Sequence, residues 1–289
     1  MTSLSSSPTS GSSDDRALDR PVTLRALNRR VNQGERFACL TAYDATMARW
    51  LQQAGVPVLL VGDSLAEVVL GLPSTIHAPL EIMLALTAGV KRGAPRCFVM
   101  GDMPFMSYQA DEADAMRNAG RFLTEGLADS VKVEVTRDHI DIVRKMASAG
   151  IPVIAHFGTR PQHVKTQGYR VSGKTASEAA QIVDEAIAFE DAGASMLLIE
   201  AVPAEVAERV VERTSIPVIG CGAGPACHGQ IVVTQDLLGL TPRQPSFAQP
   251  IDWHGEPLIA TIRTWIDRVQ TGNMGDHPYH MPDDEARKF

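Results

Sequence analysis

The strongest structural signal in this chain is the stretch Val58-Leu59-Leu60-Val61-Gly62-Asp63-Ser64. Four consecutive apolar residues suit a strand that is buried on both faces, as in a parallel sheet, and the run ends on a glycine, a carboxylate and a hydroxyl. Five further segments share this form, an apolar run that ends on an ionisable residue or a glycine: 97–102, 131–134, 152–156, 196–200 and 217–220. The pattern predicts parallel strands with chemistry at their carboxyl ends.

The spacing of these runs predicts an α/β fold, a (β/α)8 TIM barrel. Successive runs are separated by a few tens of residues, which is room for a helix and two loops. Two further strands, 37–43 and 231–233, complete the set, and helices are predicted at 80–92, 112–125, 138–149, 175–192 and 203–213. All strands of a barrel end at the same rim, so we expect five residues to converge there: Asp63, Asp102, Glu134, His156 and Glu200.

The length of 289 residues suits one barrel domain over residues 21–289, with a terminal helix at 252–272. The serine-rich residues 1–20 contain too little apolar surface to fold, and we expect a disordered tail. A short amphipathic helix at 23–30 is predicted to close the bottom of the barrel.

Charge and hydropathy exclude several functional classes. The net charge is −7 and the chain has no long basic run, which argues against nucleic-acid binding and against an anionic membrane surface. No apolar run approaches the roughly 20 residues of a membrane span, and the N-terminus lacks the apolar core of a secretory signal. The four cysteines have no Cys-x-x-Cys spacing and are predicted to be reduced. We expect a cytoplasmic protein.

The carboxylates at the strand ends predict a metal site. Asp63 and Asp102 end neighbouring strands and Glu134 ends the next, and Mg²⁺ prefers one or two carboxylates together with waters and substrate oxygens. Such an ion could chelate a 2-oxo acid and withdraw charge as an enolate forms. Strand-end aspartates equally often cap the following helix, so capping is the alternative for both aspartates.

Three more rim residues are candidates for substrate binding or proton transfer. Lys132 and Glu134 are two apart and project from the same face of a strand, where burial is costly unless they are paired or bound. Glu200 follows an apolar run, where desolvation raises a carboxyl pKa towards the value of a general base; the alternative is an ion pair with Lys132. His156 either orients a substrate oxygen or is a packed core histidine.

Several loops could complete the site. The connections 65–79 and 157–174 are long for a barrel, and the second suits a lid. The apolar segment 103–108 either walls a pocket or packs on its own helix. The glycine-rich turn 220–224 lacks a lysine and a Gly-x-Gly-x-x-Gly spacing, so it predicts close backbone packing and no nucleotide site.

Eight motifs, in order along residues 22–282, resemble the ketopantoate hydroxymethyltransferase family: Leu40-Thr-Ala-Tyr-Asp44, Leu60-Val-Gly-Asp-Ser-Leu65, Arg92-Gly-Ala-Pro95, Asp102-Met-Pro-Phe-Met-Ser-Tyr108, Val131-Lys-Val-Glu134, Glu190-Asp-Ala-Gly-Ala194, Glu200-Ala-Val-Pro203 and Ile219-Gly-Cys-Gly-Ala-Gly224. The resemblance implies a barrel of the phosphoenolpyruvate/isocitrate lyase type and Mg²⁺-dependent transfer of a one-carbon unit. The donor would be 5,10-methylenetetrahydrofolate and the acceptor 2-oxoisovalerate. The resemblance also implies that the protein is a homodecamer.

The resemblance assigns roles residue by residue. It implies metal-binding roles for Asp63 and Asp102, with Glu134 in the outer shell of the metal. Ser64 and Lys132 match substrate-binding positions, and Glu200 matches the proposed base. With the residues chosen from their position on the rim, the predicted substrate-binding set is Ser64, Asp63, Asp102, Lys132 and His156.

The chain departs from the family pattern in its loops. The substituted positions are 66–67, 72–73, 135–136, 167–169, 228 and 235, whereas the metal and base positions keep the family residues. This pattern leaves open a paralogue that acts on a different 2-oxo acid. Glu67 would disfavour a second substrate carboxylate if it faces the pocket and would change nothing if it faces solvent. A catalytically silent barrel subunit is a further alternative, but it predicts a lost ionisable rim residue and none is lost.

Overall fold

Eight short parallel strands form a closed barrel in sequence order, with β8 paired to β1. The computed structural model describes residues 20–275 and 278–289, so the predicted tail lies outside the described residues except for Arg20. The strands are β1 (Phe37–Thr41), β2 (Val58–Val61), β3 (Phe98–Asp102), β4 (Ser130–Glu134), β5 (Val153–Gly158), β6 (Met196–Glu200), β7 (Val218–Cys221) and β8 (Gly229–Val232). The predicted (β/α)8 barrel is confirmed.

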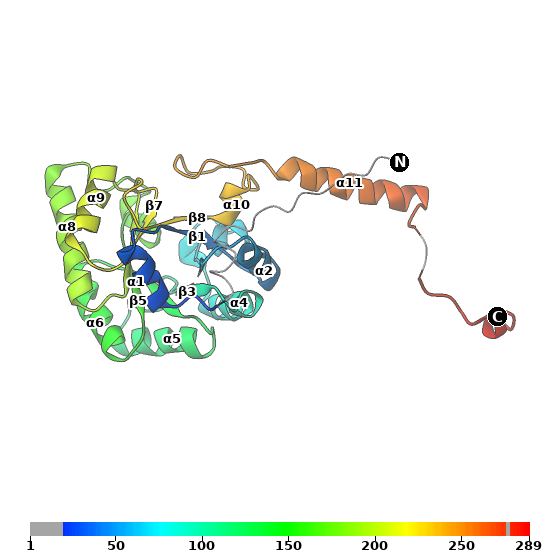
Figure 1. Cartoon of the computed structure of the whole chain (residues 1–289), viewed down its shortest axis with the longest axis horizontal. Helices are drawn as coiled ribbons and strands as arrows, with labels where there is room; N and C mark the ends of the chain where they lie inside the picture. Colours follow the sequence, from blue (N-terminus) through cyan, green and yellow to red (C-terminus); the bar gives the residue numbers. More distant parts are fainter. Residues whose placement is uncertain (1–19, 276–277) are drawn as a thin grey trace. The chain divides into compact units, whose positions relative to one another are not determined.

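Helices that follow the strands surround the barrel (Figure 1). Their ends coincide with sequence signals; for example, the Thr175 side chain caps α8 by accepting a hydrogen bond from Glu178 N. The main helices are α2 (Ala45–Gln53), α4 (Leu80–Gly93), α5 (Glu112–Thr124), α6 (Ile140–Ser148), α8 (Ala176–Asp191) and α9 (Ala204–Arg213). The last five of these lie within a few residues of their predictions, because capping residues and glycines mark helix ends in the sequence.

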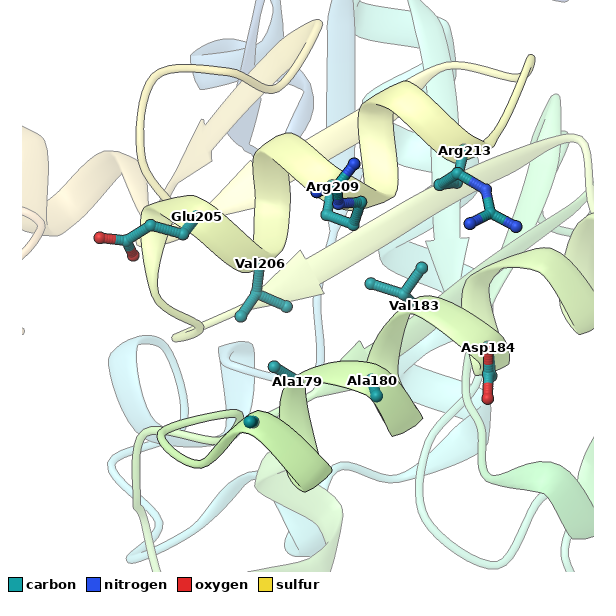
Figure 2. Close-up of a pocket in the computed structure, with 9 residues that line it drawn as sticks. Ala179, Ala180, Val183, Asp184, Glu205, Val206, Arg209 and Arg213 are labelled. Atoms are coloured by element: carbon teal, nitrogen blue, oxygen red, sulfur yellow. The ribbon is translucent and has the colours of Figure 1, made fainter.

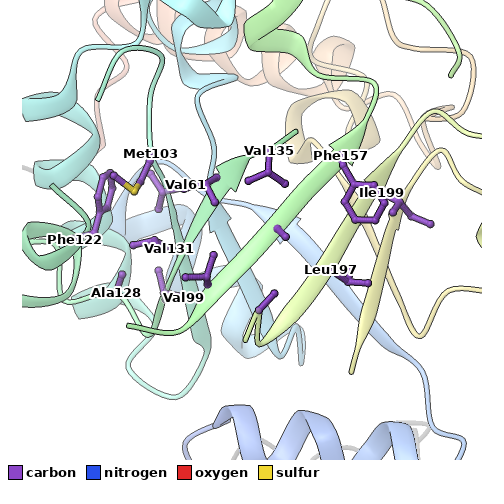
Figure 3. Close-up of a cluster of buried hydrophobic side chains, with 14 of the residues drawn as sticks. Val61, Val99, Met103, Phe122, Ala128, Val131, Val135, Phe157, Leu197 and Ile199 are labelled. Carbon is purple, nitrogen blue, oxygen red and sulfur yellow. The ribbon is translucent and has the colours of Figure 1, made fainter. Parts of the chain in front are cut away.

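The core has two layers, because alternate residues of a barrel strand point inwards and outwards. The outward residues pack against the helices in a large cluster that includes Val99, Val131, Phe122 and Leu197 (Figure 3). The inward residues near the strand starts form a smaller cluster. Leu27 of α1 (Leu24–Asn32) is fully buried in this inner cluster, so α1 closes the barrel as the sequence predicted.

Strand register brings the ionisable residues together. Asp102 is opposite Lys132 across β3 and β4, and Glu134 is opposite His156 across β4 and β5. All of β4 is buried, including its two ionisable side chains, Lys132 and Glu134. The same face of the strand therefore carries Lys132 and Glu134, as their spacing predicted.

The structure differs from the predictions mainly in the connections. The 65–79 segment contains α3 (Leu65–Val68) and the 3-10 turn η1 (Thr75–His77), and 157–174 contains η3 (Pro161–His163) and α7 (Val164–Gln167). Segments this short carry too few residues for a periodic signal. Residues 222–228 join β7 to β8 without a described helix, so the one-helix-per-strand pattern is interrupted there. The turn η2 (Arg137–His139) precedes α6.

The described chain divides into two compact units. The first comprises residues 20–234 and 246–248 and holds the barrel; the second comprises residues 235–245 and 249–289. The second contains α11 (Gly255–Thr271), which is the predicted terminal helix, and α12 (Asp283–Ala286), while α10 (Thr234–Leu237) spans the boundary. A single domain over residues 21–289 stays a prediction. None of the helices in the described ranges is long and apolar enough to cross a membrane.

Candidate active site

The predicted rim residues lie together at the carboxyl ends of β2 to β6. Asp63 lies two residues after the end of β2, and Asp102 and Glu200 are the last residues of β3 and β6. Five of the six side chains are almost completely buried, namely Asp63, Asp102, Lys132, Glu134 and His156, whereas that of Glu200 is 18% exposed. Glu200 is therefore the one among them that a molecule in solvent can reach most directly.

Asp102 is the centre of the polar contacts on β2 to β4. Its Oδ2 accepts a hydrogen bond of 2.9 Å from the backbone N–H of Asp63, and its Oδ1 lies 2.8 Å from Lys132 Nζ. These contacts exclude the capping alternative for Asp102, because the N-cap of α5 is Asp111. Ser64 occupies the N-cap of α3 without a capping bond, and Asp44 is the strand-end aspartate that does cap, at α2.

Lys132 and Glu200 do not form the direct ion pair considered as an alternative. Lys132 Nζ also lies 3.2 Å from His156 Nδ1, and His156 Nε2 lies 3.3 Å from Glu200 Oε2. An ammonium can only donate, so Nδ1 must accept and the ring proton is assigned to Nε2, facing Glu200. His156 therefore lies between the buried lysine and the carboxylate of Glu200, and its Nε2 forms no hydrogen bond within the described residues.

Burial controls the protonation of the carboxyl groups. It raises the pKa of Glu200 to about 7, against the opposing charge of Lys132. It also raises the pKa of Asp102 to about 7, opposed by Lys132 and reinforced by Asp63, and it raises the pKa of Glu134 well above the usual range. A carboxyl pKa near 7 at a partly exposed position is the property that a general base needs.

The pKa values of the two basic side chains, Lys132 and His156, are shifted in opposite directions. Burial alone would lower the pKa of the Lys132 ammonium, but the carboxylates of Asp102, Asp63 and Glu134 raise it above its usual value. Burial, reinforced by Lys132, lowers the pKa of His156 well below the usual range. Lys132 is therefore charged and His156 is neutral, which agrees with the hydrogen-bond directions above.

Ser64 and the backbone after β6 complete this part of the rim. Ser64 Oγ lies 2.8 Å from the hydroxyl of Tyr43. Ala201, next to Glu200, has φ of 46°, an uncommon conformation for a residue with a side chain. Its N–H bonds the Cys221 carbonyl and its own carbonyl accepts from Ser172 N. Such strain persists where surrounding contacts hold it, and here it lies beside the candidate base.

Two residues of the site were missed by the sequence analysis, Gln162 of η3 and Tyr108. Gln162 Nε2 donates a 3.0 Å hydrogen bond to Asp63 Oδ2, and its backbone N–H lies 3.0 Å from Glu134 Oε2. The Tyr108 hydroxyl lies 3.0 Å from Gln162 Oε1 and accepts from Glu134 N. Both residues are in loops, where burial could not be read from apolar periodicity. For Tyr108, the family motif at 102–108 was the sequence signal that could have identified it.

The loops around the rim contain both buried and exposed residues. In the 103–108 segment Met103 and Tyr108 are buried while Phe105 and Met106 are exposed, so the segment partly packs on the protein, where Asn118 of α5 binds the Ser107 carbonyl. Glu67 is exposed on α3. In the 220–224 turn, an added Cβ at Gly220 would lie 2.8 Å from Cys227 Sγ, so the predicted close packing is present.

The residues at the end of β2 and β3 fit a magnesium ion. Of the six rim residues, four carry carboxyl groups and one carries an ammonium, so a divalent cation would balance buried negative charge. Within the described chain no partner contacts Asp63 Oδ1, while Gln162 binds Oδ2. No group of three or more His, Cys, Asp or Glu residues in the described ranges is arranged to hold a metal. Mg²⁺ needs only one or two carboxylates together with waters and substrate oxygens, so Asp63 and Asp102 suit it.

A second feature of the barrel surface is separate from this rim. A groove of about 450 Å³ lies between α8 and α9 (Figure 2). Ala179, Ala180, Val183 and Val206 line it, with Arg209 near them. None of the predicted site residues lines this groove.

The family model for ketopantoate hydroxymethyltransferase matches residues 21–277. The chain belongs to the ketopantoate hydroxymethyltransferase family. A protein of Hyperthermus butylicus named 3-methyl-2-oxobutanoate hydroxymethyltransferase is 50% identical over 79% of each chain. One of the same name from Alkalilimnicola ehrlichii is 44% identical over 89% of this chain and 93% of its own. The family resemblance predicted from the eight motifs is thus confirmed.

Solved structures resemble the fold at low sequence identity. Oxaloacetate acetylhydrolase in complex with oxalate has a TM-score of 0.58 at 17% identity, covering 93% of this chain and 94% of its own. A 2,3-dimethylmalate lyase, a member of the PEP mutase/isocitrate lyase superfamily, has a TM-score of 0.57 at 19% identity, covering 92% and 94%. These structures share the barrel fold of this chain.

Proposed function

We propose that the chain transfers a hydroxymethyl group from 5,10-methylenetetrahydrofolate to 2-oxoisovalerate, also called 3-methyl-2-oxobutanoate, and so forms ketopantoate for pantothenate synthesis. The observation that carries this proposal is Glu200, a partly exposed carboxylate whose pKa is raised to about 7 beside the other rim residues. The names of the relatives support the choice of substrate.

Glu200 is the proposed base. Its carboxylate removes the proton from C3 of the 2-oxo acid, and the electron pair of that C–H bond forms the enolate. The enolate carbon then bonds to the one-carbon unit, water supplies the hydroxyl oxygen, and the folate leaves as tetrahydrofolate. His156 Nε2 lies 3.3 Å from the Glu200 carboxylate, and the charge of Lys132 stabilises the anion.

Asp63 and Asp102 would hold Mg²⁺, with Glu134 in the outer shell. When bound, the ion supplies Lewis acidity to the keto and carboxylate oxygens of the substrate. Ser64, Lys132 and His156 are the proposed substrate-binding residues, and burial of the site excludes water from the carbanion.

Proton exchange tests the proposal without the folate. In D2O with Mg²⁺ and 2-oxoisovalerate, we expect loss of the C3 proton signal by NMR, because deprotonation precedes carbon–carbon bond formation. Glu200→Gln should reduce the exchange rate by orders of magnitude, and EDTA should do the same to the native chain. The control is Glu205→Gln on α9, whose side chain lines the groove between α8 and α9 and takes no part in the described contacts of the rim residues. Exchange that is absent in the native chain, or undiminished in Glu200→Gln, would contradict the proposal.

The alternatives are less well supported. A paralogue acting on another 2-oxo acid was suggested by Glu67, but this side chain is exposed on α3, and the relatives are named for 3-methyl-2-oxobutanoate. A silent subunit would lack an ionisable rim residue, whereas the whole predicted set is brought together.

Assembly and location follow from the family resemblance. We propose a cytoplasmic homodecamer, with a 2-oxo acid and a folate as its small-molecule partners and without a nucleic-acid or membrane partner. In support, α11 carries apolar residues that are exposed in the described chain: Leu258, Ile259, Ile262, Trp265, Ile266 and Val269.

A further inference from the structure

Gln162 has the most completely satisfied side chain in the site. Nε2 donates to Asp63 Oδ2 and to the Met103 carbonyl, both at 3.0 Å. Oε1 lies 3.0 Å from the Tyr108 hydroxyl and accepts a 3.0 Å hydrogen bond from Gln109 Nε2. The amide therefore uses both of its donor hydrogens and two acceptor positions. Only 3% of the residue is exposed, so water cannot replace these partners.

The partners determine which way the amide points. Carboxylate and carbonyl oxygens, as in Asp63 and Met103, can only accept hydrogen bonds. If the nitrogen and oxygen of the amide exchanged places, the Gln162 oxygen would face two acceptors and lose both bonds. Leaving buried polar groups unpaired in this way costs about 1–3 kcal/mol each. The donor is thus held against Asp63.

The backbone of the same residue holds a second carboxylate. The Gln162 N–H lies 3.0 Å from Glu134 Oε2 and 3.2 Å from Oε1. Tyr108 contacts Glu134 as well, through the backbone N–H and carbonyl of that residue. A residue in the loop after β5 therefore bridges carboxylates that follow β2 and end β4.

We propose that Gln162 is a positioning residue, whose side-chain amide holds Oδ2 of Asp63 and so leaves Oδ1 available to bind a divalent cation. This inference rests on the proposed function, because it concerns the same metal site. Hydrogen bonds to metal-ligating carboxylates orient the ligand, and their loss typically weakens metal binding 10–100-fold.

Direct metal binding provides the test. Mn²⁺ is the probe, and its binding to the full-length protein is followed by electron paramagnetic resonance. Gln162→Met conserves the approximate length of the side chain and keeps the backbone bond to Glu134, but it removes the donor to Asp63. We expect Mn²⁺ to bind about 10–100-fold more weakly. Saturating Mg²⁺ should restore much of the C3 proton exchange, because the base Glu200 is unchanged.

Gln109→Leu is the matched control, since Gln109 contacts Gln162 but not Asp63. It should bind Mn²⁺ as the native chain does. If Gln162→Met does not fold, Tyr108→Phe removes a fully buried hydroxyl that contacts both Gln162 Oε1 and the backbone N–H of Glu134, and water cannot replace it there as it can at the partly exposed Gln109. This variant keeps both Nε2 bonds and should weaken Mn²⁺ binding to a smaller extent.

The outcomes separate the two proposals. Native Mn²⁺ affinity in a folded Gln162→Met, or in Tyr108→Phe where only that variant folds, overturns the role of Gln162, as does a native chain that binds no Mn²⁺. A native chain that binds Mn²⁺ but exchanges no proton contradicts the proposed function alone. Weakened binding in Gln162→Met, with Gln109→Leu unchanged, supports the positioning role.

Discussion

At the scale of single residues, Lys132 carries the electrostatic balance of the site. Its ammonium is buried and lies 2.8 Å from Asp102 Oδ1 and 3.2 Å from His156 Nδ1. It lowers the pKa of Asp102, Glu134 and Glu200, each of which burial raises. Without it, several carboxyl groups would be buried with no positive side chain in contact.

Lys132→Met should destabilise the metal-free protein by about 3–5 kcal/mol at pH 8, because it leaves uncompensated buried charge. In the native chain, Asp102 keeps its proton up to about pH 7 when folded but releases it near its ordinary pKa of 3.8 when unfolded. The folded state therefore binds more protons between those values, and stability falls as pH rises through this window. Loss of Lys132 raises the pKa of folded Asp102 further, so the range in which stability falls with pH extends to higher pH. The loss of free energy of unfolding in Lys132→Met should therefore be smaller at pH 5 than at pH 8.

Urea denaturation in EDTA at the two pH values measures this difference. Lys91→Met is the control, because Lys91 pairs with Asp129 at a partly exposed position. A cost for Lys132→Met that is equal at pH 5 and pH 8 would contradict the explanation by buried carboxylates.

At the scale of elements, the packing of α4 on α2 depends on a glycine. A Cβ built at Gly93 would collide with the backbone oxygen of Ala45, at the start of α2. A backbone atom cannot rotate away as a side chain can, so the helices would have to separate. The same helix contains Gly89, where a Cβ would meet nothing within 4 Å.

Gly93→Ala should therefore reduce the free energy of unfolding by about 1–3 kcal/mol, the usual cost of overpacking. Gly89→Ala should instead raise it by up to about 1 kcal/mol, because alanine is the better helix former. Thermal unfolding of the two variants beside the native chain measures both effects. Equal changes of the same sign would show that helix propensity, and not contact with α2, controls position 93.

At the scale of the whole molecule, α11 presents an apolar stripe without a buried residue of its own. Leu258, Ile262, Trp265 and Val269 recur at intervals of three and four, which places them on one face of the helix. Exposed apolar surface of this kind is typical of an interface between protein chains. It therefore supports the proposed homo-oligomer.

The double variant Ile262→Asp with Trp265→Asp should lower the molar mass measured by light scattering after gel filtration. Two carboxylates on the apolar face would have to be buried unpaired on association. Ala260→Asp, on the opposite face of α11, should leave the mass unchanged. A native chain that is monomeric, or a double variant with native mass, would contradict the assembly proposed here.

Much of the barrel could be predicted from the sequence because its strands are buried on both faces. This burial requires continuous apolar runs such as 58–61 and 196–200, and the caps and glycines between them mark the helices. The convergence of Asp63, Asp102 and Glu200 was equally predictable, since all parallel strands of a barrel end at one rim.

Side-chain pairing was not predictable, because it depends on register and on loops. Lys132 contacts Asp102, and not Glu200, because the closed barrel places β3 and β4 in register at these two residues. Gln162 reaches Asp63 from far along the chain, out of a 3-10 turn with no periodic pattern. Strand positions follow from local hydrophobicity, whereas hydrogen-bond partners follow from the three-dimensional approach of segments that are distant in sequence.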